Sequence, residues 1–186
     1  LVSFAVTAGK TSDVVSPEFK KAGNKVVVIA PEFGEDGLPV AESLMANFAV
    51  VTELLRSGKA VSCYTPTMGG VAEAVMKMAF GNGLGFRYNE CLDKNAIFGY
   101  NYGSFVLEVT EAVSCGKVIG TVTENKAIVL GEEKLCLNEI LSVYEDKLES
   151  VYSCNIADSA SDVPTYNYTA SDRVAPAIKS AKPKVI

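Results

Sequence analysis

A continuous apolar run at residues 25–32, KVVVIAPE, constrains the fold of this chain more than any other feature. Its apolar residues do not alternate with polar ones, which is typical of a strand buried on both faces. A helix is predicted next, over residues 39–57, because apolar residues recur there every three or four positions. These residues are Val40, Leu44, Phe48, Val51 and Leu55. Residues 59–64, KAVSCY, predict a second central strand, and a second helix follows from Gly69 or Gly70 to about Phe80.

The second half of the chain changes to a series of strands. Short apolar runs predict strands at residues 84–89, 104–110, 117–123 and 126–131. Glu124 and Asn125 are predicted to form a tight hairpin turn between the last two, which gives a meander. A final helix is predicted over residues 138–152, and one more strand at residues 2–7, VSFAVT. This order predicts an α+β fold, a layered mixed β-sheet with helices covering at least one face.

The composition favours a folded, cytoplasmic protein. Hydrophobic residues make up 48% of the chain and charged residues 21%, which provides enough apolar surface for a core. The formal net charge of −5 disfavours binding to nucleic acid or to anionic membranes. No apolar run in the sequence is long enough to cross a bilayer, and no signal peptide is recognised.

The absence of histidine from the sequence narrows the chemistry. It excludes a Ser-His or Cys-His catalytic pair and a histidine-ligated metal within this sequence. The five cysteines contain no CxxC pair, so free thiols are favoured over the alternative of a four-cysteine zinc site.

The stretch CYTPTMGG at residues 63–70 is the main candidate for a binding site. It leaves a predicted strand and enters a predicted helix through Gly69 and Gly70. A helix N-terminus presents unpaired amides to an anion, and the hydroxyls of Thr65 and Thr67 would lie beside them. No GK[ST] follows, so the stretch is not a P-loop. The alternative is that the glycines only permit a tight bend and close packing, which the pattern taken alone favours.

Four aromatic residues offer a second candidate, a shelf on which a ligand could lie: Tyr88, Phe98, Tyr100 and Tyr102. Packing beneath a long loop is the favoured alternative for these side chains.

Residues 61–86, VSCYTPTMGGVAEAVMKMAFGNGLGF, resemble the signature of the C-terminal domain shared by aminoimidazole ribonucleotide synthase relatives. That signature consists of a strand, an HDxSDGG-type turn and a helix. Residues 15–29, VSPEFKKAGNKVVVI, and 142–152, SVYEDKLESVY, are similar to parts of one family within this group, the large phosphoribosylformylglycinamidine synthases. Residues 171–186, SDRVAPAIKSAKPKVI, resemble the linker of those enzymes into their glutamine amidotransferase (glutaminase) domain.

The resemblance implies that the sequence is part of a longer polypeptide. Residues 1–23 would be the edge of a preceding domain and the segment leading out of it. Residues 24–154 would be the synthase C-terminal-like domain, and residues 155–186 the linker toward the glutaminase domain. The partners implied are the remaining synthetase domains and the glutaminase domain of the same polypeptide. We also expect the fragment to associate with itself through surface that those domains would cover.

The resemblance further implies a function in purine biosynthesis. The family is an ATP-dependent ligase that converts formylglycinamide ribonucleotide to its amidine, with ammonia from glutamine, and the full-length enzyme uses ATP and Mg²⁺. We expect the fragment to be inactive alone and to serve as a structural or auxiliary nucleotide-binding domain. The alternative is a non-catalytic interaction module that orients the glutaminase domain and binds no nucleotide.

The glycine turn departs from the family pattern. The family's histidine falls at Tyr64, its Mg²⁺-binding aspartate at Thr65, its nucleotide-contacting serine at Thr67 and its second acidic residue at Met68. Threonine brings no negative charge to a metal, and methionine neither binds Mg²⁺ nor moves a proton. The cofactor-binding residues predicted here are therefore Thr65, Thr67, Gly69 and Gly70, with no catalytic residue and no metal ligand.

Overall fold

The structure, a computed structural model, describes residues 2–90, 92–154, 162 and 164–167. The chain divides into two units, residues 1–152 and residues 153–186, and all described helices and strands lie in the first. The predicted boundaries at residues 24 and 154 stay predictions, because the predicted linker falls mostly outside the described residues. None of the described helices combines the length and apolar character needed to cross a membrane.

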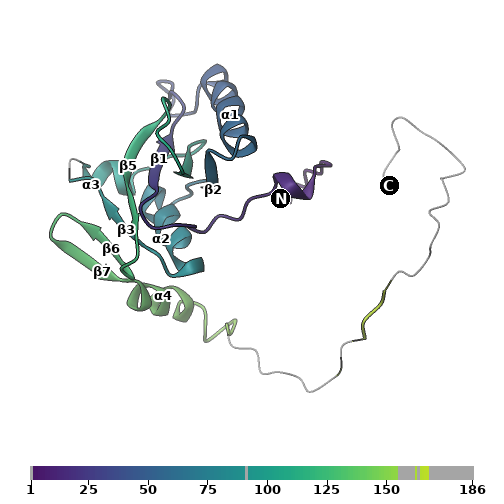
Figure 1. Ribbon diagram of the computed structural model, residues 1–186, viewed down its shortest axis with the longest axis vertical. Helices are drawn as coiled ribbons and strands as arrows, with labels where there is room; N and C mark the ends of the chain where they lie inside the picture. The colour runs from purple at the N-terminus through teal and green to yellow at the C-terminus, as the bar shows by residue number, and fades with distance from the viewer. Residues whose placement is uncertain (1, 91, 155–161, 163, 168–186) are drawn as a thin grey trace, which may run out of the picture. The chain divides into compact units, whose positions relative to one another are not determined.

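Seven strands of the described chain form one mixed sheet, in the order β2-β4-β1-β5-β3-β6-β7 (Figure 1). Neighbouring strands are antiparallel except β3 and β6, which are parallel. The strand bounds are Lys25–Ile29 (β1), Ala60–Tyr64 (β2), Gly85–Tyr88 (β3), Phe105–Val109 (β4), Lys117–Thr123 (β5), Ala127–Leu130 (β6) and Glu133–Cys136 (β7). The predicted α+β fold with a layered mixed sheet is therefore confirmed.

The described helices comprise one short 3-10 helix and four α-helices. Their bounds are Thr11–Asp13 (η1), Ala41–Arg56 (α1), Gly70–Asn82 (α2), Lys94–Phe98 (α3) and Leu137–Asp146 (α4). The helices predicted at residues 39–57 and from Gly70 onward are confirmed, since both follow a clear apolar periodicity.

Helices cover both faces of the sheet. Val26 and Val27 are neighbours on β1 and point to opposite faces, and both are fully buried. Val26 packs in a core with the apolar face of α2, whereas Val27 packs in a second core with Val51 and Leu54 of α1. The prediction that residues 25–32 contain a strand buried on both faces is confirmed, although the strand ends at Ile29.

Residues 2–7 do not form the predicted strand. Val2, Phe4 and Val6 are 77%, 90% and 95% exposed, and no strand of the described chain pairs with them. Apolar β-branched residues favour extended backbone, but a strand requires a partner for its amides and carbonyls.

Three predictions of strand pairing and helix length are also wrong. β2 lies at the edge of the sheet rather than in its centre, because β4 lies between β1 and β2. β5 and β6 do not form a hairpin, because β3 lies between them, and the hairpin joins β6 to β7 instead. The last helix ends at Asp146, and Val151 and Tyr152, predicted on its buried side, are 85% and 75% exposed.

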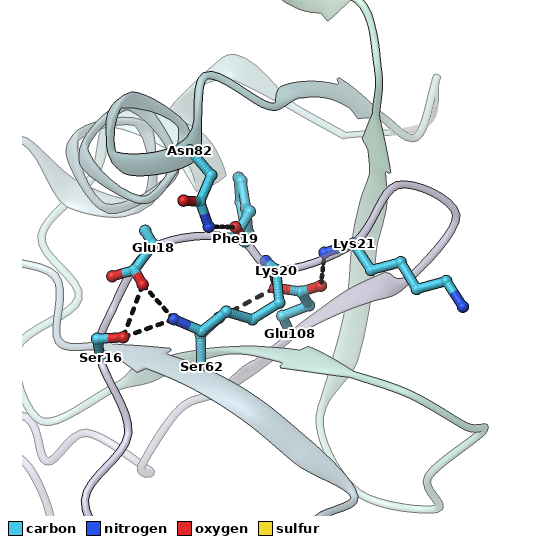
Figure 2. Close-up of polar contacts among 8 residues, drawn as sticks. All are labelled: Ser16, Glu18, Phe19, Lys20, Lys21, Ser62, Asn82 and Glu108. Atoms are coloured by element: carbon cyan, nitrogen blue, oxygen red, sulfur yellow. Dashed lines mark hydrogen bonds and ion pairs between the residues drawn. The ribbon is translucent and has the colours of Figure 1, made fainter.

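Glu108 of β4 is a fully buried carboxylate that connects three parts of the chain (Figure 2). Its oxygens accept hydrogen bonds from the backbone amides of Lys20 and Lys21, at 2.6 and 3.0 Å. The side chains of Asn24 and Ser62 also donate to it, at 2.7 and 3.2 Å. A buried charge is tolerated when its lone pairs are all engaged in this way. Glu108 thereby joins residues 20–24 to β2 and β4.

Phe19 is held between this carboxylate and α2. Its ring is fully buried and stacks on Phe86 of β3, with the ring centroids 5.6 Å apart. Its backbone amide donates to the carbonyl of Met78 at 2.8 Å. Its carbonyl accepts from the side chain of Asn82 at 2.8 Å, as Figure 2 shows. The segment that precedes β1 therefore fixes the C-terminal half of α2 against the sheet.

We expect Glu108→Gln to lower the free energy of unfolding by about 2 kcal/mol or more, because the amide NH₂ would face donors and leave them unpaired. Glu111→Gln is the matched control, since Glu111 is exposed and forms a surface ion pair with Lys59 at 3.1 Å. Its effect should stay within about 0.5 kcal/mol. Urea unfolding followed by circular dichroism measures both variants. Equal effects of the two substitutions would contradict the assigned role of Glu108.

Candidate functional site

The glycine turn lies where the sequence predicts it, between a strand and a helix. β2 ends at Tyr64 and α2 begins at Gly70, so residues 65–69 form the connection. Thr65, Thr67 and Gly69 are exposed, whereas Gly70 is buried. Of the four predicted cofactor-binding residues, three are therefore accessible to a ligand from solvent.

An anion of the protein itself occupies the turn. One carboxylate oxygen of Glu73 accepts from the hydroxyl of Thr67 at 2.5 Å and from the backbone amide of Gly69 at 2.9 Å. The other oxygen accepts from the ammonium of Lys77 at 2.7 Å. The hydrogen bond from Lys77, and then that from Thr67, lower the pKa of Glu73 from its ordinary value of 4.5 to about 2. The donors that would hold a phosphate are thus already bonded to a charged group.

Lys77 links this turn to neighbouring elements. Its ammonium lies 5.9 Å from the ring centroid of Tyr64 on β2 and 5.7 Å from that of Tyr144 on α4. Both distances allow a cation–π attraction. The hydrogen bond to Glu73 raises the pKa of Lys77, so the amine is charged at neutral pH. The ion pair of Glu73 and Lys77 is therefore held at one end by Thr67 and Gly69 and at the other by the rings of Tyr64 and Tyr144.

Gly70 serves chain packing. Its φ of +64° lies in the left-handed region, and its amide donates to the carbonyl of Thr67 at 3.0 Å. A Cβ atom at this position would lie 2.4 Å from the carbonyl oxygen of Gly99 and 2.9 Å from that of Ile97. Only glycine lets α2 begin this close to the end of α3.

The residues around the turn do not fit a Mg²⁺ site. Thr65 is neutral, Met68 carries an exposed thioether, and the carboxylate of Glu73 is engaged by three donors. Among the described residues, no cluster of three or more Cys, Asp or Glu side chains could hold a metal ion anywhere else. No reaction step is therefore assigned to a metal at this turn.

A cavity of about 620 Å³ adjoins the turn at Gly69 and Glu73. Its wall is mainly apolar and comes from α2, β3, α3, β6, β7 and α4. The aliphatic part of this wall consists of Ala72, Met76, Ile97, Ile128, Leu130, Leu135 and Ile140. Lys94 and Glu133 also line the cavity and form an ion pair at 3.0 Å.

The predicted aromatic shelf is divided by the fold. Tyr88 and Phe98 line the cavity. Tyr100 and Tyr102 instead stack on each other, with ring centroids 5.8 Å apart, and are 71% and 46% exposed. Only one half of the aromatic group therefore contributes to a hollow in the surface.

The sequence reasoning missed Glu73, the residue that occupies the turn. A signal for it exists, since an acidic residue in the first turn of a helix is favoured by the helix dipole and by the unpaired amides. No pattern in the sequence predicted that β6 and β7 would contribute to the cavity wall, because their position depends on the unexpected pairing of β3 with β6.

No family model matches the sequence. Among solved structures, PurL from Thermotoga maritima complexed with AMPPCP has a TM-score of 0.56 and 13% identity, over 69% of this chain and 27% of that chain. Phosphoribosylformylglycinamidine synthase II from Thermotoga maritima has a TM-score of 0.58 and 11% identity, over 84% and 31% of the two chains. The PurLQS structure from the same organism has a TM-score of 0.55 and 11% identity, over 87% of this chain and 32% of that chain.

These likenesses show that the chain has a PurL-like synthetase-domain fold. At 11–13% identity they show the fold alone. The chain spans about a third or less of the length of the structures that it matches.

We expect Gly70→Ala to lower the free energy of unfolding by about 3 kcal/mol. The cost of a left-handed backbone at alanine adds to the cost of the steric overlap between its Cβ and the carbonyl of Gly99. Gly58→Ala is the matched control, since its φ is +73° and nothing lies within 4 Å of an added Cβ. It should cost only the backbone penalty of about 1 kcal/mol. Urea unfolding measures both variants, and a loss at Gly70 no larger than that at Gly58 would refute the packing role.

Proposed function

We propose that this chain is a synthetase-type domain of an ATP-dependent ligase related to PurL, and that it is not active alone. The likeness in fold to PurL structures supports this, together with the small share of those chains that it spans. Solved PurL structures of this fold were obtained with ATP, with ADP and with FGAR. The reaction proposed for the whole enzyme is the conversion of formylglycinamide ribonucleotide to its amidine in purine biosynthesis.

The proposed partners are other domains of the same polypeptide, namely the remaining synthetase domains and a glutaminase domain. Within this proposal, residues 1–23 belong to the border with a preceding domain, and residues 155–186 lead toward the glutaminase domain. The exposure of Val2, Phe4 and Val6 supports such a border, because apolar side chains at alternating positions suit a strand that pairs outside this chain.

Within the ligase we assign this domain a structural role. The single observation that carries this assignment is that the carboxylate of Glu73 accepts hydrogen bonds from the hydroxyl of Thr67 and the amide of Gly69. A phosphate would have to displace a negative charge that is also bonded to Lys77. The turn then acts as a rigid connection between β2 and α2.

An auxiliary nucleotide site at Thr65, Thr67, Gly69 and Gly70 is the second candidate. It is favoured by the convergence of a hydroxyl, a backbone amide and an ammonium on one anion, since this is the donor set that a phosphate also needs. In this candidate the side chain of Glu73 moves away when the nucleotide binds.

Calorimetric titration with Mg-ADP separates the two candidates. With the structural role, the wild-type chain shows no saturable heat, and Glu73→Gln gains phosphate-dependent binding because the competing charge is removed. Saturable binding by the wild-type chain that is lost in Thr67→Ala would overturn the structural role and support the nucleotide site.

Glu139→Gln is the control for net charge. Glu139 is exposed near the start of α4 and lies outside the connection between β2 and α2. It should leave the titration of the wild-type chain unchanged. An equal gain in Glu139→Gln and Glu73→Gln would show that the gain reflects overall charge and would refute the role of Glu73.

A further inference from the structure

We propose that the cavity beside the turn binds a small, uncharged and mainly apolar molecule that carries one hydrogen-bonding group. This site goes beyond the proposed function, because its ligand is not a nucleotide. The wall of the cavity comes from α2, β3, α3, β6, β7 and α4, which all belong to one compact unit of this chain.

The size and wall of the cavity suit such a ligand. Its volume of about 620 Å³ lies within the range of roughly 300–1,000 Å³ that small-molecule sites occupy. Aliphatic side chains from five elements face it, and burying an apolar ligand against them is favourable. Met76 adds an unbranched side chain that adapts to ligands of different shape.

Tyr88 supplies the hydrogen-bonding group of the cavity. It lines the cavity and is only 5% exposed. Its ring packs edge-to-face on Phe86, at 4.8 Å between centroids. Its hydroxyl has no hydrogen-bond partner among the described residues and is not one of their fully buried unpaired atoms, so it is accessible to a ligand. A ligand with an acceptor such as a carbonyl or an ether oxygen would pair with this hydroxyl.

The charges at the cavity indicate that the ligand is neutral. Glu73 is bonded to Lys77, and Lys94 is paired with Glu133, so each charged side chain of the wall has an opposite partner. An anionic ligand would meet the carboxylate of Glu73 without a free cation to receive it. Burial raises the pKa of Tyr88, so its hydroxyl is protonated and can donate at neutral pH.

The test uses the uncharged fluorophore prodan, an aromatic ketone with an acceptor oxygen. We expect a saturable blue shift of its emission with one probe bound per chain. Tyr88→Phe should weaken the affinity about fivefold through loss of one hydrogen bond. Tyr100→Phe is the matched control, since Tyr100 is 71% exposed and lies outside the cavity wall, and it should leave the affinity unchanged.

Filling the cavity provides the second arm. Ile140→Trp on α4 should abolish the saturable shift, whereas Val143→Trp, at a position on the same helix that is 74% exposed, should not. Ala72→Met fills the cavity from α2 and keeps the test informative if Ile140→Trp does not fold. Thermal unfolding by circular dichroism identifies the variants that are folded.

Three results would overturn the proposal. These are the absence of a saturable shift, equal binding in the filled and control variants, and tighter binding of the anionic dye anilinonaphthalene sulfonate than of prodan. Mg-ADP should not displace prodan, since the two ligands are assigned to different donors. Failure of the nucleotide titration and failure of this inference are therefore separate outcomes.

Discussion

The packing of this domain depends on one buried carboxylate. An uncompensated charge in the core would cost several kcal/mol, so Glu108 is compatible with the fold only because four donors surround it. Two of these donors are backbone amides of the segment that precedes β1, at Lys20 and Lys21. Their position places Phe19 in the core, where it bonds to the C-terminal half of α2. A single acidic side chain thus determines how a loop and a helix lie on the sheet.

The other end of α2 carries the candidate site, and its geometry follows from close packing. Gly70 allows the helix to begin against the carbonyls of Ile97 and Gly99. The amide of Gly69 and the hydroxyl of Thr67 then point to one place, which the carboxylate of Glu73 occupies. The turn has the donors of an anion site, and the protein itself supplies the anion. This arrangement is what the proposed structural role requires, because the connection between strand and helix is kept while no external anion is needed to fill it.

Local patterns predicted most of the elements, although not β7, and they wrongly gave a strand at residues 2–7. The pairing between distant segments could not be read from them. β1, α1 and α2 follow apolar periodicities that a few residues determine. The insertion of β4 between β1 and β2, and of β3 between β5 and β6, depends on contacts across the chain. Glu108 had no signal, since glutamate is almost never fully buried unless it is paired, and its donors lie far from it in the sequence. The turn was located correctly from its glycines, whereas its occupant and the adjoining cavity required the tertiary structure.

The central claim is that Glu73, as a charged carboxylate, fills the turn at the start of α2. Carbon-13 NMR titration of the glutamate side-chain carboxyls in the complete chain tests it most directly. A carboxylate held by Lys77, Thr67 and Gly69 resists protonation, so its resonance should titrate with a pKa of about 2. A pKa near the ordinary value of 4.5 would mean that the carboxylate is free in solution and the turn is open to another anion.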